Sequence, residues 1–303
     1  MLLSVDIREF RCLVNPGLLR LTPLHALVGP NDSGKSATLE AILAPKDFYG
    51  RRLSFDASFS HADWSIVLHD KKIVAAPPAT ERWLQGLRRI SFRADMLRAP
   101  SELLVEGSTL EFRSPQGNGL PAVLDALRNR NDDAWTRIAA EMQSLFPAVA
   151  QLTLINTSSS AKQVAVTLKG GQRVSAADLS DGLLLYLAFC TLREAKHEGM
   201  LLIEEPENGL HPSRIADVMR VLRHLTERGT QVLLTTHSPL VVNELRPDEV
   251  TVVTRDASGS HFMRIDETPN FAARSDAYRL GELWLAYCDG VGESPLLRGG
   301  PRL

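Results

Sequence analysis

The chain has 303 residues, of which 44% are hydrophobic and 23% are charged, and its formal net charge is -2. This length is enough for one large domain, or for a domain that carries a sizeable insertion. The nearly neutral charge excludes any whole-molecule argument for binding nucleic acid or an anionic membrane, although a local basic patch is still compatible with it.

Two further features of the composition bear on the compartment. Cys12, Cys190 and Cys288 are far apart and form no C-x-x-C pair. This spacing argues against a disulfide framework or a zinc site and favours a reducing compartment. The N-terminus alternates apolar and polar residues, unlike a signal peptide, and the longest apolar stretch, residues 183–189, is far shorter than the ~20 residues of a membrane helix. We therefore expect a cytoplasmic protein without membrane contact.

The first elements predict a strand, a loop and a helix. An edge or meander strand is expected over residues 3–10, and a second strand over residues 24–28. The second strand leads directly into a glycine-rich loop. A helix over residues 36–43 follows, and Pro45 ends it.

The loop itself, GPNDSGKS at residues 29–36, is a complete G-x-x-x-x-G-K-S phosphate-binding sequence. Its glycines allow a tight turn whose backbone N–H groups face a phosphate. Lys35 is expected to reach the β- and γ-phosphates, and Ser36 to bind Mg²⁺. Between a strand and a helix, this pattern predicts nucleotide binding.

Residues 47–151 lose the alternation of strands and helices, and prolines and glycines interrupt them repeatedly. We interpret this region as an inserted, partly helical lobe. Within it, Trp135, Ile138, Met142 and Leu145 recur at helical spacing, which predicts an amphipathic helix that ends before the next proline.

The middle of this lobe is basic. A set of local salt bridges or a solvated face is the favoured interpretation, and contact with a phosphate backbone is the second. The residues concerned are Arg82, Arg88, Arg89, Arg93 and Arg98.

The C-terminal half again alternates strands and helices. Two short strands lead to the sequence LSDG, and a helix, a buried strand, a second helix, a second buried strand and a hairpin follow. The expected ranges are 152–156, 163–169, 183–196, 200–203, 215–226, 231–235, and 250–254 with 261–265 for the hairpin.

Paired acids end the first buried strand, in the sequence LLIEEPE at residues 201–207. A buried parallel strand delivers such residues to the carboxyl edge of a sheet, where open α/β folds bind ligands. Glu204 is expected to hold Mg²⁺, and Glu205 to polarise the attacking water as a general base. Two adjacent carboxylates here would repel each other unless a cation lay nearby.

Two weaker signals accompany the acids. His237 follows the next buried strand, where it could contact a γ-phosphate or the attacking water, although a lone histidine is as often structural. In LSDG, Ser180 and the backbone N–H groups lie at a helix N-terminus and could bind an anion. Taken alone, Ser180 and Asp181 are ordinary helix N-cap residues.

The order of these motifs resembles the head domain of the ABC ATPase class, and within it the RecF, SMC and OLD-type branch. The residues that carry the resemblance are 29–36, LSDG at 179–182, EEPENGLHP at 204–212 and TTHS at 235–238. Small bacterial ATPases of this branch also have a GELW-like tail, here residues 281–284. The resemblance covers most of the chain except the middle insertion.

The resemblance implies an α/β P-loop NTPase fold, with a mixed sheet, flanking helices and a partly helical insertion. Residues 1–46 and 152–290 would form the ATPase core, 47–151 the inserted lobe, and 291–303 a flexible tail.

The resemblance also implies a head-to-tail homodimer, or a higher even oligomer, with ATP and Mg²⁺ held between subunits. Glu204, Glu205 and the switch residue His237 would carry out hydrolysis, and residues 208–211 would form the D-loop. Ser180 and Gly182 would act in trans on the partner's γ-phosphate, and Mg²⁺ would be held by Ser36 and Glu204. The phosphates would be lined by Gly29, Asn31, Gly34, Lys35, Ser36 and Thr38.

The chain departs from the usual ABC pattern in two residues. Asp181 replaces the first glycine of the signature, and Glu204 replaces the usual aspartate, as both do among OLD-type relatives. No Q-loop glutamine can be assigned, because Gln116 follows no clear strand. An SMC-type arm would need hundreds of heptad residues, and an OLD nuclease would need a TOPRIM domain after His237, so both are argued against by length.

Three functions follow from this pattern. The leading one is an ATPase whose ATP-dependent dimerisation gates a DNA-related activity, in repair or in defence against phage. The second is a regulatory ATP switch that controls a separately encoded nuclease or toxin. The third, less favoured, is the nucleotide-binding subunit of an ABC transporter.

Overall fold

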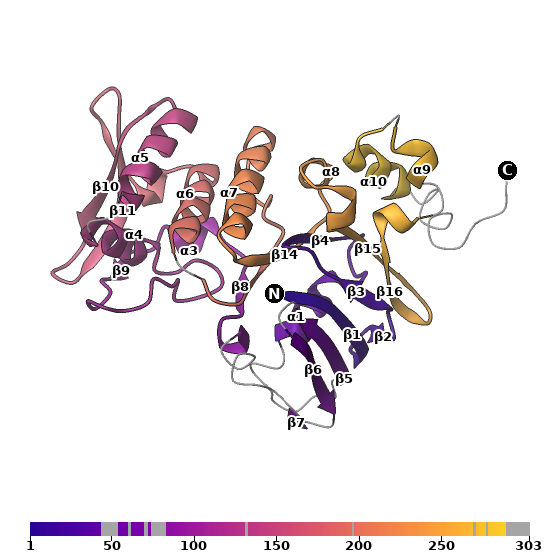
Figure 1. Cartoon of the computed structure of the whole chain (residues 1–303). Helices are drawn as coiled ribbons and strands as arrows, with labels where there is room; N and C mark the ends of the chain where they lie inside the picture. The colour runs from indigo at the N-terminus through magenta and orange to yellow at the C-terminus, as the bar shows by residue number, and fades with distance from the viewer. Residues whose placement is uncertain are drawn as a thin grey trace. The chain divides into compact units, whose positions relative to one another are not determined.

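The structure is a computed structural model of the chain (Figure 1). It describes residues 1–43, 54–59, 62–69, 72–73, 83–130, 133–195, 197–268, 271–276 and 278–288. The chain forms two compact units, which are described separately. Unit 1 contains Met1–Arg89, His197–Glu207 and Leu225–Leu303, and unit 2 contains Ile90–Lys196 and Asn208–His224.

Unit 1 is built on a six-stranded sheet with the order β16-β15-β4-β14-β13-β8. The pairs β15–β4, β4–β14 and β14–β13 are parallel, and β15–β16 is an antiparallel hairpin. The strands β4 and β14 are buried along their whole length, as parallel strands covered on both faces must be. Their bounds are β4 Leu24–Val28, β8 Arg88–Ile90, β13 Met200–Glu204, β14 Gln231–Thr236, β15 Val250–Asp256 and β16 Gly259–Arg264.

A second sheet of unit 1 has the order β2-β1-β5-β6-β7, with β3 also paired to β1. The strand β1 is therefore interior, because it pairs with β2 and β3 as well as with β5. The bounds are β1 Leu2–Phe10, β2 Leu13–Val14, β3 Leu18–Arg20, β5 Ser54–Phe59, β6 Ala62–His69 and β7 Lys72–Ile73.

The helix α1, Lys35–Leu43, shares one apolar core with both sheets of unit 1. Leu2 and Ile7 of β1, Leu39 and Ile42 of α1, and Leu202 of β13 are fully or almost fully buried members of this core. Burial of such side chains stabilises a fold by roughly 1.5–3 kcal/mol each. The core therefore fixes the strand β4, the loop that follows it and α1 as one body.

The end of unit 1 is helical. The helices are α8 Pro239–Val242, α9 Phe271–Arg274 and α10 Leu280–Cys288, and α10 packs on α8. The predicted tail, 291–303, lies outside the described residues. No helix in the described part of the chain is both long and apolar enough to span a membrane.

Unit 2 combines an antiparallel sheet, ordered β10-β11-β12 with β9 paired to β11, with a group of helices (Figure 1). The helix α4 packs on β11, α5 packs on β10, and both contact α6. Ile138 and Met142 of α5 are buried, as the amphipathic spacing predicts. The bounds are α3 Ala94–Leu97, β9 Ser101–Glu102, α4 Leu120–Asn129, α5 Ala134–Leu145, β10 Val149–Asn156, β11 Ala161–Leu168, β12 Arg173–Ser175, α6 Asp181–Glu194 and α7 Ile215–Glu227.

The sequence-based inserted lobe, residues 47–151, is divided between the two units. The strands β5, β6 and β7 belong to the second sheet of unit 1, whereas residues from Ile90 onward belong to unit 2. The lobe boundaries at 47 and 151 stay a prediction.

Candidate functional site

The loop between β4 and α1 has a geometry that depends on glycine. A Cβ on Gly29 would lie 2.3 Å from the carbonyl oxygen of Val253, so any larger residue would force the backbone apart. Gly34 has φ +111°, a conformation that side chains rarely adopt. The Nζ of Lys35 donates to the carbonyls of Gly29 and Pro30, at 2.7 Å each. The loop thus curls around a nearly buried ammonium group.

The same loop has polar groups that fit a phosphate ligand. Asn31 and Ser36 are exposed, whereas Ser33 is buried and its hydroxyl has no hydrogen-bond partner among the described residues. Thr38 donates to the carbonyl of Gly34 at 3.0 Å and so supports the loop from within α1. An ammonium, an unpartnered hydroxyl and an exposed hydroxyl at a helix N-terminus are suited to phosphate oxygens and Mg²⁺.

The paired acids lie at the carboxyl end of β13, as predicted. Glu204 is the last residue of the strand, and the backbone N–H of Glu205 donates to the carbonyl of Thr235 on β14, at 2.9 Å. Glu205 has φ +42°, in the left-handed region. Such strain costs roughly 1–3 kcal/mol and is concentrated at functional sites. No sequence pattern indicated this conformation.

The cation that the paired acids require is supplied by Arg89. Its Nη2 donates to Oε1 and Oε2 of Glu204, at 2.8 and 2.9 Å, and its Nη1 lies 4.0 Å from Glu40. Both Arg89 and Glu204 are partly buried, which strengthens their attraction relative to an exposed ion pair. The predicted Mg²⁺ ligand Glu204 is therefore already engaged, and Mg²⁺ would have to share it with Arg89 or displace the guanidinium.

This pairing makes a prediction about Mg²⁺ dependence. In Arg89→Ala, Glu204 loses its competing cation, so we expect the Mg²⁺ concentration for half-maximal ATP hydrolysis to fall several-fold. The measurement is a Mg²⁺ titration of initial rates at saturating ATP. Arg20→Ala is a matched control, because Arg20 pairs with Glu267 at an exposed position of the same unit. A higher Mg²⁺ requirement in Arg89→Ala would contradict the competition.

His237 meets both the expected general base and a residue that the sequence analysis missed. Its Nδ1 lies 3.2 Å from Oε1 of Glu205 and 4.0 Å from Oε1 of Glu207. Glu207 accepts a hydrogen bond from the Thr236 hydroxyl at 2.5 Å, and its other carboxylate oxygen has no hydrogen-bond partner among the described residues. Burial raises the pKa of Glu207. The only sequence signal for Glu207 was its place in the EEPE run.

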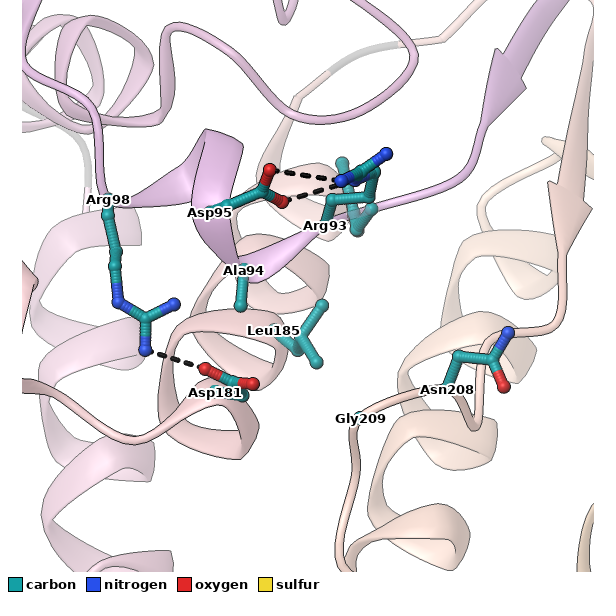
Figure 2. Close-up of a pocket in the computed structure, with 9 residues that line it drawn as sticks. Arg93, Ala94, Asp95, Arg98, Asp181, Leu185, Asn208 and Gly209 are labelled. Carbon is teal, nitrogen blue, oxygen red and sulfur yellow. Dashed lines mark hydrogen bonds and ion pairs between the residues drawn. The ribbon is translucent and has the colours of Figure 1, made fainter.

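The LSDG segment lies in unit 2, at the start of α6. Ser180 is exposed and occupies the N-cap position of α6, but its side chain makes no capping hydrogen bond. Arg98 Nη2 donates to the carbonyl of Leu179 at 2.7 Å. It also donates to Asp181 at 2.6 Å, as Figure 2 shows. The acidic residue in place of the usual signature glycine is thus balanced by an arginine.

A pocket of about 290 Å³ adjoins this segment within unit 2 (Figure 2). Asp181 and Leu185 of α6, the segment from Phe92 to Arg98, and Asn208 with Gly209 line it. The predicted D-loop, residues 208–211, therefore lies against the signature helix. Both arginines of the pocket are offset by acids, since Arg93 pairs with Asp95 at 3.1 Å and Arg98 pairs with Asp181.

The arginines of the basic segment favour the salt-bridge interpretation. Arg89, Arg93 and Arg98 each pair with a carboxylate, and Arg88 donates to backbone carbonyls of Gln85 and Leu87. Arg82 lies outside the described residues. Among the described arginines of this segment, these contacts satisfy local charges, which favours the salt-bridge interpretation over contact with a phosphate backbone.

The predicted site residues are thus divided between the units. Lys35, Ser36, Glu204, Glu205 and His237 belong to unit 1, on the strand ends and the loop of its parallel sheet. The signature and D-loop residues Ser180, Gly182 and 208–211 belong to unit 2. Their assigned roles stay predictions.

A family model described as "AAA domain, putative AbiEii toxin, Type IV TA system" matches residues 43–243, about two thirds of the chain. The chain belongs to this family. The matched range begins just after the phosphate-binding loop and contains the LSDG segment, the paired acids and His237. No protein with curated annotation is significantly similar to this chain in sequence.

Solved structures of SMC head domains share the fold. An SMC head bound to the C-winged helix domain of ScpA has a TM-score of 0.58 and 12% identity, over 86% of this chain and 96% of that one. The SMC head domain from Thermotoga maritima has a TM-score of 0.50 and 15% identity, over 87% and 98%. An SMC head with an extended coiled coil, bound to the C-terminal domain of ScpA derived from Pyrococcus furiosus, has a TM-score of 0.54 and 12% identity, over 86% and 95%. The predicted ABC-class ATPase head fold is confirmed.

Proposed function

We propose that this protein is a cytoplasmic ATPase that binds Mg-ATP and hydrolyses it. The observation that carries the proposal is a convergence at one sheet edge. The neighbouring parallel strands β4, β14 and β13 end in the phosphate-binding loop, in His237 and in the paired acids, respectively. Ligands of open α/β folds bind outside the carboxyl ends of such strands.

Each group at this edge has a distinct role in the proposal. Lys35 and the loop N–H groups hold the β- and γ-phosphates, while Ser36 and Glu204 hold Mg²⁺. Bound Mg-ATP supplies a γ-phosphoryl group that can be transferred to water. Glu205 accepts the proton of the attacking water, and His237, 3.2 Å away, orients that carboxylate.

The proposal includes ATP-dependent dimerisation. Ser180 is exposed, makes no capping hydrogen bond and precedes a 14-residue helix, so its hydroxyl and the N–H groups at that terminus are available to an anion. We assign Ser180 and Gly182 to the γ-phosphate held by a partner copy, in a head-to-tail homodimer. The SMC head fold supports this arrangement by analogy.

Two biological roles are compatible with such a dimer. It could gate a DNA-related activity in repair or anti-phage defence, or act as a switch on a separately encoded nuclease or toxin. The toxin named in the family description, and the local pairing of Arg89, Arg93 and Arg98, favour the switch. Hydrolysis measured with and without duplex DNA at low salt separates the two, because stimulation by DNA would favour the DNA-related role.

Light scattering of Glu205→Gln tests the dimer. The variant keeps the loop that binds ATP but loses the general base, so we expect its mass to double only when Mg-ATP is present. Glu106→Gln, at an exposed position of unit 2, is the matched control and should stay monomeric while it hydrolyses ATP. If Glu205→Gln stayed monomeric with ATP bound, LSDG would have no role beyond starting a helix. The proposed dimer would then be wrong, and the protein would be a P-loop ATPase without a shared site.

A further inference from the structure

The first turn of helix α10, Leu280–Cys288, contains the sequence GELW, residues 281–284, and the proposed function uses none of these residues. The helix belongs to unit 1 and packs on α8, which starts two residues after His237. Trp284 is 1% exposed, and its indole is the largest fully buried side chain among the described residues. Its Nε1 donates to the carbonyl oxygen of His237 at 3.3 Å.

A second anchor lies one turn earlier in α10. The backbone N–H of Gly281 donates to Oδ1 of Asn243 at 2.8 Å. A Cβ on Gly281 would lie 2.1 Å from the carbonyl oxygen of Pro239 and 2.8 Å from Asn243 Oδ1. Only glycine permits this close approach, so the contact between α10 and α8 depends on the absence of a side chain.

The contacts of Trp284 and Gly281 hold the two ends of residues 237–243, the segment that begins with His237. Trp284 contacts the His237 main chain, and Gly281 contacts Pro239 and Asn243. On the strand side, the N–H of Ser238 donates to the Thr236 hydroxyl at 2.9 Å. The main chain is therefore fixed, whereas the imidazole is 51% exposed and lies near the carboxylates of Glu205 and Glu207.

We propose that α10 is the support that sets the position of His237 relative to Glu205, with Trp284 and Gly281 as positioning residues. This inference rests on the proposed function, in which His237 orients the general base. A helix that fixes the main chain of a switch residue determines whether its ring meets the carboxylate, and small misplacements are costly in catalysis.

Gly281→Ala tests the close approach. The added methyl group pushes α10 away from Pro239, so we expect kcat to fall on the order of tenfold. The KM for ATP should change less than twofold, because the contacts given for Gly281 and Trp284 are with residues 237–243 and the phosphate-binding loop lies at residues 29–36. Gly170→Ala is the matched control, since a Cβ there meets no atom within 4 Å, and its kcat and KM should equal those of the wild type.

Trp284→Phe tests the second anchor with a variant that keeps an aromatic ring in the core. It removes the N–H donor, and we expect a smaller decrease in kcat, also at unchanged KM. NMR of the histidine side chains gives a second readout that does not depend on hydrolysis. The His237 signal, assigned by its loss in His237→Gln, should shift in Gly281→Ala and Trp284→Phe and stay in place in Gly170→Ala.

The results separate failure of this inference from failure of the proposed function. An unmoved His237 signal and wild-type kcat in both variants would overturn the support role of α10 while the ATPase stands. A rise in KM equal to the loss in kcat/KM would also overturn it, because it would indicate a general disturbance of nucleotide binding. A wild-type protein without ATPase activity would overturn the proposed function, and the His237 signal would still decide whether α10 positions that residue.

Discussion

Lys35→Ala is expected to bind ATP about 100-fold more weakly than the wild type, because charge-assisted hydrogen bonds contribute about 1.5–3 kcal/mol each. In the structure Lys35 is 7% exposed, and its ammonium group lies within the loop, where it donates to the carbonyls of Gly29 and Pro30. Phosphate oxygens placed in that loop would face the same ammonium. Alanine leaves no side-chain cation there.

Calorimetric titration with a slowly hydrolysed ATP analogue measures this loss directly. Lys169→Ala is the control, because Lys169 is exposed at the end of a β-hairpin of unit 2 and should bind ATP like the wild type. Thermal unfolding of both variants shows whether the loop still folds without its two lysine bonds. A folded Lys35→Ala protein with wild-type affinity would refute nucleotide binding by this loop.

The central sheet could be predicted from the sequence because its signal is strong and local. Buried parallel strands are almost continuously apolar, so β4, β13 and β14 stand out in the chain. The polar residues that end these strands then fall at one edge by geometry alone. The glycine loop, the paired acids and His237 were found in this way.

The contacts around those residues could not be predicted, because they join distant segments. Arg89 pairs with Glu204 across 115 positions of the chain, and Trp284 reaches the His237 carbonyl across 47. A single sequence does not indicate which carboxylate a given basic residue will pair with. The left-handed backbone of Glu205 is equally invisible, since that conformation is normally signalled by glycine or asparagine.

The strands β5, β6 and β7 were missed for a different reason. They extend the second sheet on one side of β1 by antiparallel pairing, where strands can form with only weak alternation of apolar and polar residues. The sequence around them was assigned to a partly helical lobe. The strand β5 pairs with the distant β1, and β6 and β7 extend the sheet from it. Tertiary context thus overrode the local pattern in the region where the family resemblance was weakest.

The substitution at the signature loop shows how structure can account for a departure from a family pattern. Asp181 brings a negative charge to the start of α6, where helix dipoles favour an anion. Arg98 binds both that carboxylate and the Leu179 carbonyl, which fixes the loop on both sides of Ser180. Ser180 is therefore presented by a defined loop, and its proposed role in trans can be tested by substitution.

A mixture of two variants that are each inactive is expected to recover ATP hydrolysis. Ser180→Arg should bind ATP as a monomer but fail to dimerise with itself, because both sites of that dimer would place a long cation against a loop that holds ATP. Lys35→Ala should bind ATP about 100-fold more weakly, so at ATP concentrations well below its Kd its own loop stays largely empty and it does not dimerise with itself. In a mixed head-to-tail dimer, the intact loop of the Ser180→Arg subunit meets the intact Ser180 of the Lys35→Ala subunit. Because neither variant dimerises with itself, the dimers of an equimolar mixture are mixed and have one good site in two, so we expect at most about half of the wild-type rate.

Initial rates of phosphate release from the mixture, compared with each variant alone, measure this recovery. The control mixture pairs Lys35→Ala with a Lys35→Ala, Ser180→Arg double variant, which offers no intact loop and should stay inactive. If each site were instead complete within one subunit, Ser180→Arg alone would retain activity or the mixture would recover none. Recovery in the test mixture, without recovery in the control, is an outcome that only a site shared between two copies of this chain can produce, because neither variant alone contains both halves of it.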